Sequence, residues 1–278
     1  MFNSDIITES STLFLNSHGF SLTEKSLKHG FNKSAIRVEN ERQSKEIGKK
    51  LGEYVSITLP EKYQDYKRYL IKILSQSLIR FYENVDFGKN KIILVTGLGN
   101  DNYTADSLGI KTIEKVKIKK GNEFYRFESG LRLTSLAPNV SANTGIDSFE
   151  ITKGVIDRIS PSLVIAVDTL SASTFKKVGK VFQITDAGIK PGSGVGKGGH
   201  WFEEKSLGVP IVAIGVPLVV TVYNIVRHYV GSYDISDSEK RELENLYVTP
   251  KNIESLIDFA SEIIASAINE SAENFCFV

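Results

Sequence analysis

The sequence has few residues from which a disulfide, a metal site or a strongly charged surface could be built. Only one of its 278 residues is cysteine, Cys276, and four are histidine. A single cysteine cannot form an internal disulfide, which suits a reducing compartment, and the histidines show no His-Glu-x-x-His spacing. The 34 basic and 33 acidic side chains leave a formal charge of +1, whereas nucleic-acid binders usually carry a strongly basic face. We therefore expect no metal, no other cofactor and no direct nucleic-acid partner.

The sequence also lacks an uninterrupted apolar run long enough to cross a membrane. Its most apolar stretch, residues 209–230, contains two prolines and a glycine, followed by Asn224, Arg227 and His228. A spanning helix needs about 20 apolar residues without such breaks, so we predict a strand and then a helix here. The first twelve residues include Asp5 and Glu9 and no basic segment, which is not the pattern of a secretory signal. We expect a cytoplasmic protein without a membrane segment.

Most of the chain shows the alternation of strands and helices that is typical of an α/β fold. Residues 1–60 are polar and weakly periodic, and they predict an irregular arm with a strand near residues 54–59. Apolar residues then recur at helical spacing over 66–81. Short apolar runs predict buried strands, and helical patterns lie between them. The strands are expected at 91–96, 131–136, 163–167, 181–185 and 211–215, and the helices at 105–116, 147–159, 218–230 and from Pro250 to about 268, capped by Thr249.

This order predicts a three-layer α/β sandwich with a mostly parallel sheet, formed by a single domain over residues 61–278. Ligands bind beyond the carboxyl ends of the strands of such a sheet. Two acids are expected at that edge, Asp106 after the Gly97-Leu98-Gly99 turn and Asp168 after an apolar strand. A structural role is an alternative for each. Asp106 could complement a helix dipole, and Asp168 could bind loop amides.

A glycine-rich segment, residues 186–199, is expected to form a rim or lid at the same edge. It is not a phosphate-binding loop, because Pro191 and Gly198 stand where that motif needs a glycine and a hydroxyl residue. A dinucleotide-binding turn also fails, because Asn102 replaces its third glycine. Free backbone amides of a flexible rim could hold a substrate main chain. The candidate rim or substrate-binding residues are Asn100, Asp186, Lys190, Gly192, Ser193 and Gly194.

Several sequence blocks between about residues 91 and 270 form a specific combination. They are Gly97-Leu98-Gly99-Asn100 with Asp106 and Leu108-Gly109, Leu136-Ala137-Pro138 with Thr144-Gly145-Ile146, Lys153-Gly154-Val155-Ile156, Val164-Ile165-Ala166-Val167-Asp168, residues 186–196, residues 207–217, and Val248-Thr249-Pro250-Lys251. In this order they resemble the germination protease family of spore-forming bacteria. The N-terminal third of the chain matches the family weakly.

The resemblance implies an aspartic-type endopeptidase that needs no metal and degrades small acid-soluble spore proteins during germination, inside the spore. The two essential acids of the family match Asp106 and Asp168. The core also resembles that of hydrogenase-maturation endopeptidases. A homo-oligomer is compatible with the resemblance. The chain departs from the family at Ser173, Lys190 and Thr221, where Arg, His and Asp are common, and it is shorter before Val248.

The N-terminal segment Ser4-Asp5-Ile6-Ile7-Thr8-Glu9 resembles the cleavage pattern of the family. This suggests self-processing between Asp5 and Ile6, with chance similarity as the alternative. Two other functions stay open. One is a metal-dependent maturation endopeptidase that uses Asp106, Asp168 and His200. The other is a protein without enzymatic activity that binds the same spore proteins or forms a scaffold.

Overall fold

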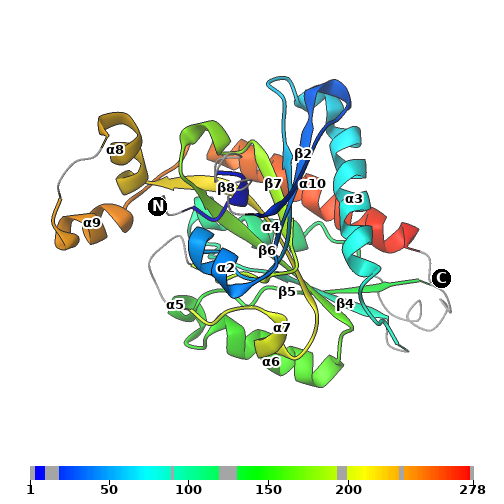
Figure 1. The fold of residues 1–278 in the computed structure, drawn as a ribbon. Coiled ribbons are helices and arrows are strands. Elements are labelled where there is room, and N and C mark those ends of the chain that lie inside the picture. The colour runs from blue at the N-terminus through cyan, green and yellow to red at the C-terminus, as the bar shows by residue number, and fades with distance from the viewer. Residues whose placement is uncertain are drawn as a thin grey trace.

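The computed structural model describes residues 4–9, 19–88, 91–118, 130–192, 199–231 and 235–275. Within these ranges nine strands form one sheet (Figure 1). The strands are β1 (Ser21–Ser26), β2 (Asn32–Val38), β3 (Gly52–Thr58), β4 (Ile92–Gly97), β5 (Arg132–Leu136), β6 (Leu163–Ala172), β7 (Val181–Thr185), β8 (Ile211–Thr221) and β9 (Tyr247–Val248). Their order across the sheet is β1-β2-β3-β7-β8-β6-β4-β5, and β9 pairs with β8.

The prediction of a mostly parallel sheet is wrong, because the sheet is mixed. The β5-β4-β6-β8 portion is parallel, and every pairing among β1, β2, β3, β7 and β8, together with β8–β9, is antiparallel. Only residues 173–180 separate β6 from β7, which is too short for the crossover that a parallel strand requires. The chain therefore reverses direction at β7, and β3 continues the sheet from there.

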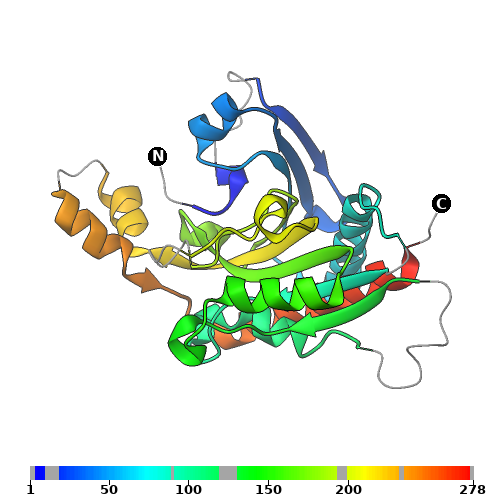
Figure 2. The same ribbon diagram turned by 90° about the horizontal axis from the view of Figure 1, so that it is seen from below.

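Helices cover both faces of the sheet, as expected for an α/β fold. On one face, α3 (Lys67–Tyr82), α4 (Leu108–Ile113) and α10 (Ile253–Asn274) pack on the largest apolar cluster. On the other, α6 (Ser148–Ile159) and α7 (Glu204–Leu207) pack on a second cluster, and Figure 2 shows α6 lying along this face. Successive residues of a strand point to opposite faces, so β4, β6 and β8 contribute side chains to both clusters.

The resemblance to a hydrogenase-maturation core stays a prediction.

The N-terminal arm is more regular than predicted. Besides β1, β2 and β3 it contains α2 (Glu41–Ile47), which is capped by the Asn40 side chain. β1 is mostly solvent-exposed and β2 is only partly buried, so they lack the apolar run of a buried strand. β2 pairs with β3, whose residues 54–57 are buried, and β1 pairs with β2, so both strands join the main sheet.

The predicted order of a strand and then a helix at residues 209–230 is confirmed by β8 and α8 (Val222–Val230), but residues 218–221, predicted as helix, belong to β8. In Figure 1, α8 and α9 (Asp237–Glu244) project from one side of the sheet. Among helices in the described ranges, none combines the length and the apolar character needed to cross a membrane. The predicted cap of the last helix is wrong, because α10 begins at Ile253 and the Thr249 hydroxyl donates instead to the carbonyl of Leu218.

Candidate functional site

The segment after β4 is packed so closely against β6 that it requires glycine. Gly99 has φ +112°, and a Cβ atom there would lie 1.9 Å from the carbonyl oxygen of Asp106. A Cβ at Gly109 would lie 2.4 Å from the carbonyl oxygen of Val167 and 2.3 Å from that of Leu98. Real Cβ atoms do not approach so closely, so these glycines allow the start of α4 to lie against the ends of β4 and β6.

Asp106 is the last residue of a short 3-10 helix, Thr104–Asp106, that precedes α4. The predicted helix over 105–116 therefore begins later than expected, at Leu108. The carbonyl oxygen of Asp106 accepts a hydrogen bond from the Asn100 amide at 3.0 Å. Its half-buried side chain thus sits on a closed loop rather than in the first turn of a long helix.

Asp168 lies inside β6 rather than at its end, because the strand continues to Ala172. Its side chain is 4% exposed, and its Oδ1 accepts a hydrogen bond from the amide of Thr169 at 2.8 Å. The Thr169 hydroxyl in turn donates to the carbonyl of Ala105 at 2.9 Å. Because Thr169 follows Asp168 and Ala105 precedes Asp106, this bond joins the segments that carry the two acids. The structure therefore brings Asp106 and Asp168 to one region.

The environment of the two carboxyl groups favours their protonated forms. Burial raises the pKa of Asp106 to about 6, although the backbone N–H of Asn100 partly offsets this effect. Burial raises the pKa of Asp168 well above its usual range, and the nearby charge of Asp106 raises it further. Two neighbouring carboxyl groups do not both ionise readily, so the pair can retain one proton near neutral pH.

These shifts predict a specific pH dependence of stability. The folded protein binds a proton at Asp106 more tightly than the unfolded chain does, because the pKa is raised from 3.8 to about 6. The resulting stabilisation is complete below about pH 4 and is lost as the pH rises through about 6. Asp106→Asn should therefore be more stable than the wild type at pH 8, by roughly 1–3 kcal/mol, and should lose this advantage at pH 4. Urea denaturation at both pH values measures the difference. Asp65→Asn at an exposed site is the control, and equal pH dependence of the two variants would contradict the prediction.

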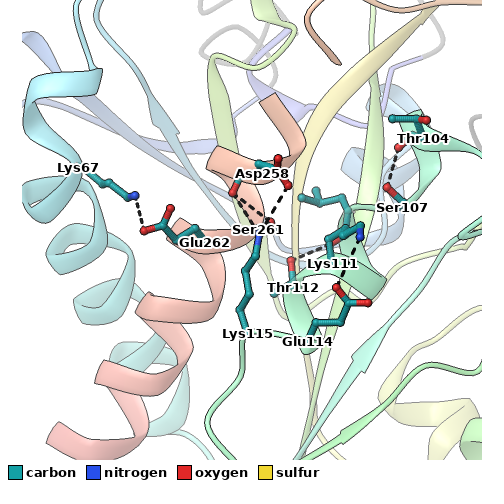
Figure 3. Close-up of polar contacts among 11 residues, drawn as sticks. Lys67, Thr104, Ser107, Lys111, Thr112, Glu114, Lys115, Asp258, Ser261 and Glu262 are labelled. Atoms are coloured by element: carbon teal, nitrogen blue, oxygen red, sulfur yellow. Dashed lines mark hydrogen bonds and ion pairs between the residues drawn. The ribbon is translucent and has the colours of Figure 1, made fainter. Parts of the chain in front are cut away.

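Polar contacts anchor α4 and the loop before it (Figure 3). The Ser107 hydroxyl donates to the carbonyl of Thr104 at 2.8 Å, inside the loop that carries Asp106. Beyond α4, the Lys115 ammonium donates to the Ser261 hydroxyl of α10 at 2.5 Å and lies 3.9 Å from a carboxylate oxygen of Asp258. The loop before α4 is therefore closed on itself, and the residues after α4 are tied to α10.

The predicted self-processing segment lies along the end of β6 and beside β7. The amide of Asp5 donates to the carbonyl of Ser171 at 2.9 Å, and the Ser171 amide donates to Oδ2 of Asp5 at 2.8 Å. The Gln183 side chain donates to the carbonyl of Asp5 and accepts from the amide of Ile7, both at 2.9 Å. Ile6 and Ile7 are 2% and 0% exposed. Asp5 is held by main-chain hydrogen bonds to the end of β6, whereas Ile7–Glu9 form a short 3-10 helix, and the side chains of Ile6 and Ile7 lie in separate apolar clusters.

The acidic side chains of this segment face hydrogen-bond donors and a positive charge. The Glu9 carboxylate accepts a hydrogen bond from the backbone amide of Ser173 at 2.8 Å. Arginine is common at position 173 in the family, and here the main chain of that residue makes the contact instead. The Lys49 ammonium donates to the carbonyl of Ser4 at 2.6 Å. Burial lowers the pKa of Lys49, and the charges of Asp5 and Glu9 raise it. An acidic peptide therefore compensates a lysine that would otherwise be unfavourably buried.

Two of the predicted rim residues have structural partners. Oδ1 of Asn100 accepts from the amide of Asn102 at 3.0 Å and from the side chain of Asn143 at 3.1 Å. Oδ1 of Asp186 accepts from the amide of Glu53 at 2.7 Å and so fastens the end of β7 to β3. Both side chains therefore hold the loops around the site in place.

Of the remaining rim residues, Lys190 borders a small cavity. Lys190, together with Asp5, Lys49, Gln183 and Trp201, lines a cavity of about 190 Å³. Gly192 has φ +67°, while Ser193 and Gly194 lie outside the described residues. A larger cavity of about 730 Å³, between β1, β2 and α3, is lined by several lysine and arginine side chains among polar and apolar ones, and no predicted site residue lines it.

The predicted alternative with His200 as a metal ligand is not assembled in the described part of the chain. The Nδ1 atom of His200 lies 3.9 Å from a carboxylate oxygen of Asp147, and its ring packs on Phe149 with centroids 5.1 Å apart. Across the described ranges, no group of three or more His, Cys, Asp and Glu side chains is placed to hold a metal. His200 therefore does not join the two aspartates in a ligand set there.

Sequence reasoning missed two residues of the site, Lys49 and Gln183. Gln183 had a detectable signal, because it is the one amide in the apolar run Val181–Thr185 that predicted a buried strand. A buried amide needs hydrogen-bond partners, and here the peptide main chain provides them. Lys49 had no such signal, because it lies in a polar, charged stretch.

Comparison with known proteins supports the same family. A family model described as germination protease matches residues 7–233. Proteins named germination protease from Clostridium tetani and Clostridium perfringens are 33% and 31% identical to this chain, over 84% and 90% of it and 82% and 87% of their own length. Another, from Geobacillus sp., is 35% identical over 70% of this chain and 54% of its own length. These similarities support a protease role. With the family model matching well over half of its length, the chain belongs to the germination protease family.

Proposed function

We propose that this chain is an endopeptidase that begins the degradation of small acid-soluble spore proteins during germination, in the spore interior. Its catalytic groups are Asp106 and Asp168. The observation that carries the proposal is the pair of buried carboxyl groups whose pKa values are both raised, one of them by the charge of the other. Such pairs occur where a single proton must be shared for acid–base chemistry.

The proposal gives the two acids different roles. Asp106, with a pKa of about 6, is the carboxylate that takes a proton from water above that pH. Asp168 keeps its proton and donates a hydrogen bond to the carbonyl oxygen of the peptide bond being cleaved. Water oxygen then bonds to the carbonyl carbon. When the C–N bond breaks, the leaving nitrogen receives a proton and departs as an amine, and the other product is a carboxylic acid.

The bound N-terminal segment supports an acidic-peptide substrate. Ser4–Glu9 combines the family's cleavage pattern with hydrogen bonds from its main chain to β6 and to the Gln183 side chain, and the charge of Asp5 is close enough to raise the pKa of Asp168 further. In the proposed function the protein also cleaves itself between Asp5 and Ile6. The segment would then act as a pro-segment. A homo-oligomeric state stays a prediction.

A cleavage assay tests the proposal directly. Purified wild-type protein is incubated with a purified small acid-soluble spore protein, with and without excess chelator. Mass spectrometry then identifies the products, and N-terminal sequencing follows the protein itself. We expect cleavage after an acidic residue that precedes an apolar one, a new N-terminus at Ile6, and no effect of the chelator. Loss of activity with chelator would favour a metal-dependent peptidase, and binding of the spore protein without cleavage would favour a non-enzymatic role.

A further inference from the structure

We infer that Gln183 is a substrate-clamping residue that binds the main chain on both sides of the bond to be cleaved. The inference rests on the proposed function, with Ser4–Glu9 as an intramolecular example of the substrate. The Nε2 group of Gln183 donates to the carbonyl oxygen of Asp5, which belongs to the Asp5–Ile6 bond, and Oε1 accepts from the amide of Ile7. Both bonds are 2.9 Å long, and together they use the donor and the acceptor of the amide.

The sheet register places Gln183 on the same face as the proposed catalytic acid. Gln183 of β7 is paired with Gly215 of β8, and Gly215 is paired with Asp168 of β6. Residues paired across a sheet point to the same face, so Asp168 and Gln183 flank a glycine from either side, two strands apart. Neighbouring strands are about 4.8 Å apart, which gives a separation of about 10 Å between the two backbones. Asp5, Gln183, Leu170 and Gly215 all line the small cavity at this place.

The geometry assigns a chemical role as well as a binding role. When water adds to the carbonyl carbon of Asp5, negative charge develops on the oxygen that Gln183 Nε2 already contacts. A fixed amide donor at that position stabilises the charge in the way of an oxyanion-hole side chain. Gln183 is 5% exposed and its side chain is held at both ends, so little reorganisation is needed during the reaction. The acceptor bond to the next amide keeps the peptide in register with the acids.

Two substitutions separate the two halves of the clamp. Gln183→Met keeps the length of the side chain and removes both hydrogen bonds. Gln183→Glu keeps an acceptor for the amide of Ile7 and removes the donor to the carbonyl. Ser56→Ala is the matched control. Ser56 is paired with Gln183 in β3 and is fully buried, and its hydroxyl has no hydrogen-bond partner in the described ranges.

The variants are compared in kcat and KM for cleavage of a small acid-soluble spore protein. Gln183→Met should lower kcat/KM by about 100-fold, and Gln183→Glu should lower kcat by a similar factor with a smaller change in KM. Ser56→Ala should match the wild type. Melting temperatures show whether each variant is folded. Unchanged kcat/KM in both Gln183 variants would overturn the inference and leave the peptidase proposal intact.

A second measurement does not depend on catalysis. In the Asp168→Asn background, amide hydrogen exchange of residues 4–9 reports how firmly the segment is held. Adding Gln183→Met should accelerate this exchange, and adding Ser56→Ala should not. If the wild type cleaves no peptide, the proposed function fails. The exchange data then decide the clamp, and unchanged exchange in the Gln183→Met protein would reject it.

Discussion

Asp168→Asn should lower the rate of peptide cleavage by at least about 1000-fold while the protein stays folded. Asparagine has nearly the same shape as a protonated aspartate, but its amide N–H is a far weaker acid than a carboxylic O–H and polarises the carbonyl of the peptide bond much less. Because the Asp168 carboxyl is buried and its pKa is raised well above its usual range, removing its titration should not destabilise the fold. The measurement is kcat/KM for a purified small acid-soluble spore protein, with a thermal melt of the same sample.

Asp106→Asn should cause a loss of similar size, because the base that accepts the proton of water is gone. If the two acids work as a pair, the double variant should be little worse than either single one. Asp65→Asn is the control, because Asp65 is exposed and is not one of the candidate site residues. More than a tenth of wild-type activity in the Asp168→Asn protein would exclude the acid pair as the catalytic group.

Gly109→Ala should destabilise the fold by roughly 2–3 kcal/mol and should also lower activity. The added Cβ would lie 2.3–2.5 Å from three backbone atoms of Leu98 and Val167, so α4 must move away from the strands that carry the site. Backbone atoms cannot rotate out of the way as a flexible side chain can. The free energy of unfolding in urea measures the first effect, and kcat/KM measures the second.

Gly154→Ala is the matched control for Gly109→Ala. Gly154 is also a helical glycine, in α6, but a Cβ there would meet no atom within 4 Å. Alanine has the higher helix propensity, so this variant should be more stable by about 0.5–1 kcal/mol. Equal effects of the two substitutions would show that the close packing at Gly109 does not constrain the fold.

The sequence predicts the buried strands well and the exposed ones poorly. The run Val181–Thr185 forms β7 with the expected bounds, because both of its faces are covered and its residues are nearly all apolar. The polar residues of β1 and β2 gave no such signal, because these strands keep much of their surface in solvent. The sequence also did not predict the direction of the strands correctly. Apolar content reports burial, and it does not report whether a neighbouring strand is parallel or antiparallel.

The sequence predicted the site residues that lie in recognisable motifs, and it did not predict those that only the folded sheet brings together. Asp106 and Asp168 follow recognisable glycine-rich and apolar segments, so both could be proposed. Gln183 lies in the same row as Asp168 only because β6, β8 and β7 pair in one register, and its hydrogen bond to Asp5 joins residues 178 positions apart in the chain. No local pattern carries that information.

One row of paired residues across the sheet limits how this region can evolve. It consists of Ser56, Gln183, Gly215 and Asp168. Side chains alternate between faces along a strand, so inserting or deleting one residue in β7 would turn Gln183 toward the layer formed by α3 and α10. Phe182 or Ile184, which now belong to the apolar cluster on that side, would then face the acids. A substitution within β7 changes one side chain on one face. A change in its length would exchange the polar and apolar surfaces of the strand at once.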